Sequence, residues 1–136
     1  MGRTVLVVDP SDALRERTRK LLEAHGYDVL EASDGIGAWG MVCRHRPGLI
    51  TVRRPNEVYG VRALFDSIRA NVEMEGIPVV VVDPGPNYAE DLQERHTVLC
   101  QLDIFEAPEN FVRVVDELLR STNSHDPGPS AGVSAR

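Results

Sequence analysis

The sequence predicts an α/β fold in which a parallel sheet is covered by helices on both faces. Short apolar runs typical of buried strands alternate with longer segments of helical periodicity. The strand runs lack the apolar–polar alternation of a half-exposed sheet, which indicates strands covered on both sides. Clear runs cover Thr4–Val8, Leu49–Val52 and Ile77–Val82, and weaker ones cover Tyr27–Ala32 and Leu102–Ala107.

Helical patterns fill the intervals between these runs. Ser11 is a suitable N-cap for a first helix, and Gly26 suits the left-handed position just after its end. Asp34 can begin a second helix, although the glycines inside it weaken its regularity. Further helices are predicted over Gly60–Asn71, over the polar segment Tyr88–Thr97, and from Pro108 onward.

The order of elements is therefore (βα)5, and it limits the topology of the sheet. Right-handed crossovers favour a flavodoxin-like, doubly wound sheet with strand order 2-1-3-4-5. We expect one domain over residues 1–121. The composition then shifts to small and polar residues, so we expect residues 122–136 to be a disordered tail or a truncated linker.

Composition limits the classes of function. The chain has 136 residues and a net charge of −6, with 21 acidic and 15 basic residues, which argues against direct nucleic-acid binding. Cys43 and Cys100 lack the spacing of a metal site, and we expect reduced, half-buried thiols. No basic-plus-apolar leader is visible, and no apolar stretch approaches the ~20 residues that cross a bilayer. We therefore expect no membrane contact and a cytoplasmic location.

Charged residues follow the three clear strand runs. They are Asp9, Arg53 and Asp83. The carboxyl ends of parallel strands meet at one edge of a sheet, where sites are built in open α/β folds, so we expect these side chains to converge. An arginine between two aspartates is the unusual feature of this group.

The chain resembles a response-regulator receiver domain over residues 3–120. The resemblance rests on the following segments: Val5–Asp9, the stretch Leu21–Gly35, Arg46–Pro47, Ile77–Val82 and Ala107–Pro108. The second segment is the most specific, because it joins a helix, a strand and the next helix start in the order and spacing of that family.

The resemblance implies a definite phosphoryl-transfer chemistry. Receivers of this kind take a phosphoryl group from a histidine kinase onto an aspartate at the end of the third strand. An acidic pair after the first strand helps to hold Mg²⁺, which neutralises charge on the phosphoryl group. A Thr or Ser after the fourth strand and a Lys after the fifth contact the phosphoryl oxygens.

The residues of the acid pair and the acceptor are mostly absent from this sequence. Asp9 matches one member of the acidic pair, but its partner position holds Pro10. The acceptor position falls on Arg53, and a shift of one residue gives Val52 or Arg54 instead. An arginine stays protonated and is no acceptor for an aspartyl phosphate.

The remaining positions also depart from the family pattern. The Thr or Ser position holds Asp83, and the Lys position holds Ala107. The aromatic residue often found a few residues before that lysine corresponds to Ile104 or Phe105, and the sequence does not choose between them. We therefore expect a degenerate phosphorylation pocket with no catalytic residue, no cofactor, and Mg²⁺ binding that is weak or absent.

Arg53 has two possible placements. Its guanidinium could lie between Asp9 and Asp83 as a built-in cation, because strand-end carboxylates attract a nearby guanidinium. Alternatively, it could point to solvent beside Arg54. The first placement predicts a self-neutralised pocket that accepts no phosphate.

The leading functional hypothesis is a pseudo-receiver, a non-enzymatic two-component module that signals by protein–protein interaction. Its partner would be a histidine kinase, an output domain, another regulator or a second copy. By analogy with active receivers, the contact face would be the fourth helix, fifth strand and fifth helix, around residues 88–97 and 102–118. The alternative is a small anionic-ligand sensor or enzyme that uses the Asp9, Arg53 and Asp83 edge. The chain could also be a fragment of a longer protein.

Overall fold

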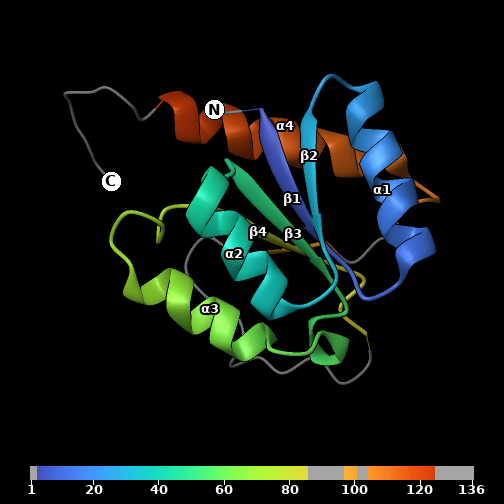
Figure 1. The fold of residues 1–136 in the computed structure, drawn as a ribbon. Helices are drawn as coiled ribbons and strands as arrows, with labels where there is room; N and C mark the ends of the chain where they lie inside the picture. Colours follow the sequence, from blue (N-terminus) through green and yellow to red (C-terminus); the bar gives the residue numbers. More distant parts are fainter. Residues whose placement is uncertain (1–2, 86–96, 101–103, 125–136) are drawn as a thin grey trace.

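A computed structural model describes residues 3–85, 97–100 and 104–124 of the chain. Its strands are β1 (Thr4–Val8), β2 (Asp28–Ala32), β3 (Leu49–Arg53), β4 (Val79–Val82) and β5 (Thr97–Cys100). Its helices are α1 (Asp12–Ala24), α2 (Gly35–His45), the 3-10 turn η1 (Pro55–Glu57), α3 (Val61–Ala70) and α4 (Pro108–Ser124). Figure 1 shows the strands side by side with helices around them.

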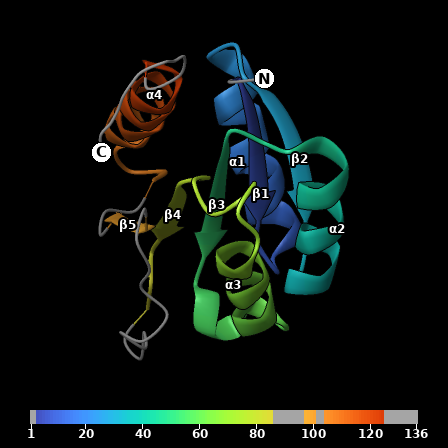
Figure 2. The same ribbon diagram turned by 90° about the vertical axis from the view of Figure 1, so that its left-hand side faces the viewer.

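The sheet has the predicted flavodoxin-like topology. Its five strands are parallel and lie in the order β2-β1-β3-β4-β5. Helices cover both faces, with α2 and α3 packed on one and α1 and α4 on the other, as the two views in Figures 1 and 2 show. The fold class predicted from the pattern of apolar runs is therefore confirmed.

The core is divided into two layers by the sheet. Alternate residues along each strand point to opposite faces, so Leu6 and Ile50 face α2 and α3, whereas Val7 and Leu49 face α1 and α4. The predicted apolar stripes of the helices pack into these layers. The buried members of the stripes include Leu22, Leu64, Phe65, Ile68, Phe111, Val115 and Leu119.

The predicted helix ends are also observed. The Ser11 side chain accepts a hydrogen bond from the amide of Leu14 at 3.2 Å, and the Asp34 side chain accepts one from the amide of Gly37 at 2.8 Å. Gly26, just after α1, has φ of 91°. Pro108 is the first residue of α4. Local capping chemistry thus sets where these helices begin and end.

Gly35 allows α2 to begin against the loop before α3. The Gly35 amide donates to the carbonyl of Tyr59 at 2.7 Å. A Cβ atom at Gly35 would lie 2.1 Å from the Gly60 carbonyl oxygen, which no side chain can tolerate. The glycine that weakened the sequence-based helix prediction is therefore required by close backbone packing.

The prediction for the fifth strand was wrong. Strand β5 covers Thr97–Cys100, whereas residues 104–106 form a turn before α4. Both runs are short and apolar, and the sequence pattern alone does not decide which of two such runs forms a strand. The run at 97–100 is uninterrupted, whereas Asp103 and Glu106 interrupt the other. Of the helix predicted over Tyr88–Thr97, Thr97 belongs to β5 and the rest lies outside the described residues.

Two smaller expectations differ from the structure. Helix α4 continues to Ser124, so residues 122–124 are helical rather than part of a tail, and residues 125–136 lie outside the described part. Cys43 is exposed, not half-buried, because it lies on the outer side of α2. Trp39 is partly buried against the core beneath α2.

Candidate functional site

The register of the sheet brings Asp9 and Arg53 together. Val8 of β1 pairs with Val52 of β3. The residues that follow them, Asp9 and Arg53, therefore lie side by side at the carboxyl edge of the sheet. Arg53 in turn pairs with Val82 of β4, one residue before Asp83. The three side chains predicted to converge therefore do so.

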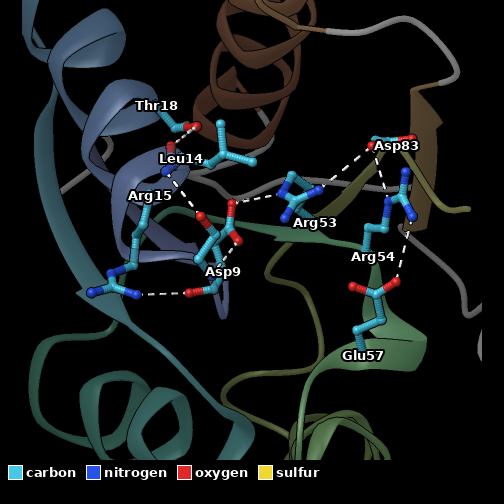
Figure 3. Close-up of polar contacts among 9 residues, drawn as sticks. Asp9, Leu14, Arg15, Thr18, Arg53, Arg54, Glu57 and Asp83 are labelled. Carbon is cyan, nitrogen blue, oxygen red and sulfur yellow. Dashed lines mark hydrogen bonds and ion pairs between the residues drawn. The ribbon is translucent and has the colours of Figure 1, made fainter.

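The Arg53 guanidinium lies between the two aspartates, as Figure 3 shows. Its Nε donates to Oδ2 of Asp9 at 2.9 Å, and its Nη1 is 3.6 Å from Oδ2 of Asp83. The Asp9 side chain is 1% exposed and that of Arg53 is 16% exposed. The first placement of Arg53, inside the edge rather than in solvent, is the one observed.

Asp9 has both carboxylate oxygens engaged. Oδ1 accepts from the amide of Ser11 at 2.9 Å, while Oδ2 accepts from Arg53. A carboxylate this deeply buried needs such partners, because a buried charge without them is costly. The Arg53 guanidinium therefore neutralises the buried Asp9 carboxylate from within the fold.

Arg54 supplies a second guanidinium to Asp83. Its Nε donates to Oδ2 of Asp83 at 3.1 Å, and its Nη1 is 3.4 Å from Oε2 of Glu57 in η1. The hydrogen bond to Asp83 raises the pKa of Arg54 above its usual value. Asp83 thus shares one oxygen between Arg53 and Arg54.

Arg15 is a site residue that the sequence did not reveal. Helical periodicity alone assigns it to the polar side of α1, but its side chain is only 15% exposed. Its Nη1 donates to the carbonyl of Asp9 at 2.8 Å, and its Nε donates to Glu31 of β2 at 3.0 Å. The one available signal was its position, one turn after the Ser11 cap and therefore above the end of β1.

The other predicted pocket residues are dispersed. Pro10 is exposed on the loop after β1. The carbonyl of Ala107 accepts from the amide of Asn110 at 3.1 Å, which makes Ala107 part of the start of α4. Ala107 is not among the residues that line the cavities beside Arg53, whereas Ile104, 3% exposed, lines both of them.

Ile104 and Phe105 have different surroundings. Ile104 packs in the core layer beneath α1 and α4 and borders a cavity of about 10 Å³ with Asp9 and Arg53. Phe105 is partly exposed, with the Arg17 guanidinium 4.1 Å from its ring centre. Both residues also line a larger open cavity of about 390 Å³, and Arg53 lines this cavity as well as the smaller one.

Neither a metal-binding cluster nor a membrane-spanning helix occurs among the described residues. Across residues 3–85, 97–100 and 104–124, no group of three or more His, Cys, Asp or Glu side chains could hold a metal ion. Within the same ranges, no helix is long and apolar enough to span a bilayer.

Comparison with known proteins identifies the class. The sequence is 30% identical over 84 residues to the polar-differentiation response regulator DivK of Brucella anthropi, covering 60% of this chain and 67% of that protein. It is 33% identical over 89 residues to a chemotaxis protein CheY homolog of Campylobacter jejuni, covering 63% of this chain and 68% of the relative. No protein-family model matches the sequence.

Solved structures agree on the fold. The signal receiver domain of a signal transduction histidine kinase from Syntrophus aciditrophicus aligns with a TM-score of 0.73 and 18% identity, over 93% of this chain and 97% of that one. This match shows the fold, and the two sequence relatives show the family. The chain belongs to the response-regulator receiver family of two-component signalling.

Proposed function

We propose that this chain is a phosphorylation-independent receiver, a pseudo-receiver that signals by protein–protein interaction. The observation that carries the proposal is the buried contact of 2.9 Å between Arg53 and Asp9. In the receiver pattern, the position of Arg53 belongs to the phosphoacceptor aspartate. A guanidinium there offers no carboxylate nucleophile, and it neutralises the acid that would otherwise help to hold a metal.

The donor set does not fit Mg²⁺, which supports the same proposal. Mg²⁺ requires oxygen ligands in near-octahedral geometry. Asp9 already gives one oxygen to the Ser11 amide and the other to Arg53. Asp83 faces two arginines, and Pro10 contributes no side-chain oxygen. A divalent cation would have to displace a fixed positive charge, so we expect its binding to be weak or absent.

Exposure to a phosphoryl donor tests the proposal. The protein is incubated with Mg²⁺ and acetyl phosphate, and its intact mass is then measured. A receiver that keeps the acceptor aspartate is treated in parallel to show that the donor is active. We expect the control, but not this chain, to gain about 80 Da, the mass of one phosphoryl group. A gain of that size on this chain would overturn the proposal.

The proposed partner is a histidine kinase, an output domain, another regulator or a second copy of the chain. Fold analogy directs attention to residues 88–97 and 102–118. Within this region, α4 exposes the charged side chains Glu109, Arg113 and Glu117. Light scattering tests the homodimer, and capture from the native cell tests the other partners.

The capture experiment is more informative with a matched variant. The double variant Asp9→Asn/Arg53→Met removes both charges of the buried pair and leaves no charge unpaired there. Loss of the partner from this variant would link recognition to the pocket. Unchanged capture would place recognition elsewhere on the chain, with α4 as the next region to vary.

A small-ligand sensor remains the second candidate function. The observation in its favour is the cavity of about 390 Å³ beside Arg53, a volume within the usual range for ligand sites. Against an anionic ligand stands the neutralisation of Arg53 by Asp9 and Asp83. A thermal-shift screen with nucleotides and carboxylates distinguishes the two hypotheses, because only the sensor hypothesis predicts a concentration-dependent rise in melting temperature.

A further inference from the structure

Two non-glycine residues at the site have left-handed backbones and face each other. Arg54, directly after β3, has φ of 49°, and Asp83, directly after β4, has φ of 47°. Side chains with a Cβ atom rarely adopt this conformation unless the surroundings hold them there. Such residues often mark functional positions, so their juxtaposition calls for a physical cause.

The cause is a set of contacts that joins the two residues directly. The Arg54 amide donates to the carbonyl of Val82 at 3.2 Å, and its side-chain Nε donates to Oδ2 of Asp83 at 3.1 Å. The Arg54 side chain also extends over Gly85, where an added Cβ would lie 3.6 Å from Arg54 Cδ. Each strained residue is thus held by the other.

Asp83 connects this outer contact to the buried pair. The same Oδ2 atom lies 3.6 Å from Nη1 of Arg53, which is bonded to Asp9. The inner pair is shielded, because Asp9 is 1% exposed. The outer pair is open to solvent, with the Arg54 and Asp83 side chains 35% and 42% exposed. The inner contact is therefore durable, whereas solvent and solutes reach the outer one.

We propose that Asp83 and Arg54 form an electrostatic latch that couples the backbone after β3 to the backbone after β4, an inference that rests on the proposed phosphate-independent function. In the latched state both residues are left-handed and paired. In the released state the pair is broken, and both residues relax toward ordinary backbone conformations. The ends of β3 and β4 then change together, while Arg53 stays bonded to Asp9.

The latch responds to a competing acidic group. Both partners are accessible, and a carboxylate or phosphate on a binding protein would take the Arg54 guanidinium away from Asp83. Salt weakens the contact in the same direction, because pairs at the surface are screened more strongly than buried ones. Acidic ligands thus act on the loops after β3 and β4 without any covalent transfer to the chain.

Nuclear magnetic resonance and hydrogen exchange on the full chain test the latch. Asp83→Asn removes the charge while keeping a residue that tolerates the left-handed region. Arg54→Met removes the other charge at similar length. Glu57→Gln is the matched control, because it removes the other acidic contact of Arg54, at 3.4 Å, and leaves Asp83 intact. Backbone couplings of residues 54 and 83 report φ, and amide exchange reports the opening of the two loop ends.

The latch makes a reciprocal prediction. In Asp83→Asn, the unmutated Arg54 leaves the left-handed region, and in Arg54→Met the unmutated Asp83 does so. Exchange at both loop ends rises together by up to about fivefold, the range expected for a partly exposed pair. Added sodium chloride moves the wild type in the same direction and leaves Asp83→Asn unchanged. Glu57→Gln resembles the wild type.

Independent loop ends would overturn the latch. If Asp83→Asn alters only its own amide and Arg54 keeps its φ, or if salt affects wild type and variant equally, the two residues are not coupled. This failure is distinct from failure of the proposed function. A phosphoryl adduct on the wild type refutes phosphate independence whether or not the loops are coupled.

Discussion

Replacing Arg53 with methionine isolates the contribution of the buried ion pair. The substitution keeps an apolar chain of similar length and leaves Asp9, 1% exposed, without its cation. Removing one partner of a buried pair typically costs about 3–5 kcal/mol, because the remaining charge stays desolvated. Asp9 keeps its 2.9 Å hydrogen bond from Ser11, and Arg53 itself is 16% exposed. We therefore expect the lower end of that range, about 3 kcal/mol.

A double-mutant cycle separates this loss from simple loss of packing. Asp9→Asn/Arg53→Met removes both charges, and we expect it to lie within about 1 kcal/mol of the wild type, since replacing a buried pair is often neutral. The coupling between the two positions should then exceed about 1.5 kcal/mol, within the range measured for contacting residues. Urea unfolding followed by circular dichroism gives the free energy of unfolding of each protein. Arg113→Met, on the exposed side of α4, serves as the surface control.

Two results would contradict the reasoning. If Arg53→Met costs less than about 1 kcal/mol, the Asp9 carboxylate reaches water or another donor, and the pair is an ordinary surface contact. If the double variant is as unstable as the single one, the loss of stability comes from poor packing of the methionine side chain and not from the unpaired charge of Asp9. In either case the claim that Arg53 neutralises the site from within would fail.

The remaining predictions concern the scaffold that holds the site. Gly35→Ala should cost about 2–3 kcal/mol by overpacking, because its Cβ would lie 2.1 Å from the Gly60 oxygen, whereas Gly76→Ala, with nothing within 4 Å, should be nearly neutral in the same unfolding assay. Ser11→Ala should cost about 1 kcal/mol by removing the cap of α1, and Ser67→Ala inside α3 should cost less; equal effects would show that the cap contributes nothing. Tyr27→Phe should cost about 1–2 kcal/mol because the buried Tyr27 hydroxyl donates to Asp116 of α4, and an unchanged midpoint in urea would show that this bond is not needed.

The features that followed from the sequence are those encoded by local pattern and by parallel pairing. The alternation of apolar strands with helical stripes predicts the strand order of the sheet. Because the carboxyl ends of parallel strands lie at one edge, the same pattern predicts that Asp9, Arg53 and Asp83 lie close together. The sequence left two placements open for the Arg53 guanidinium, and the structure shows the one between the two acids, where charge attraction at short range favours it. The strand order and the convergence of the three strand ends needed no knowledge of loop geometry.

The features that could not be predicted from the sequence depend on which of two similar segments forms a strand and on how far a long side chain reaches. The runs at 97–100 and 102–107 are both short and apolar, and only pairing with β4 selects the first. Because the strand lies earlier, Ile104 rather than Ala107 faces the site. Arg15 escaped notice because helical periodicity assigns a face to a residue, but a long side chain reaches beyond that face to the Asp9 carbonyl.

The most direct test of the central claim is a titration of the wild-type protein with Mg²⁺ and then with beryllofluoride, a phosphoryl mimic. The titration is monitored by the nuclear magnetic resonance shifts of the backbone amides. An acceptor site would bind both through carboxylate oxygens, and the amides beside the strand ends would shift to saturation. Because the Arg53 guanidinium is already bonded to the Asp9 carboxylate, we predict no saturable amide shift at Asp9, Ser11, Arg53 or Asp83. Saturable shifts at these residues would show that the site still binds a metal and a phosphoryl group, and they would contradict the account.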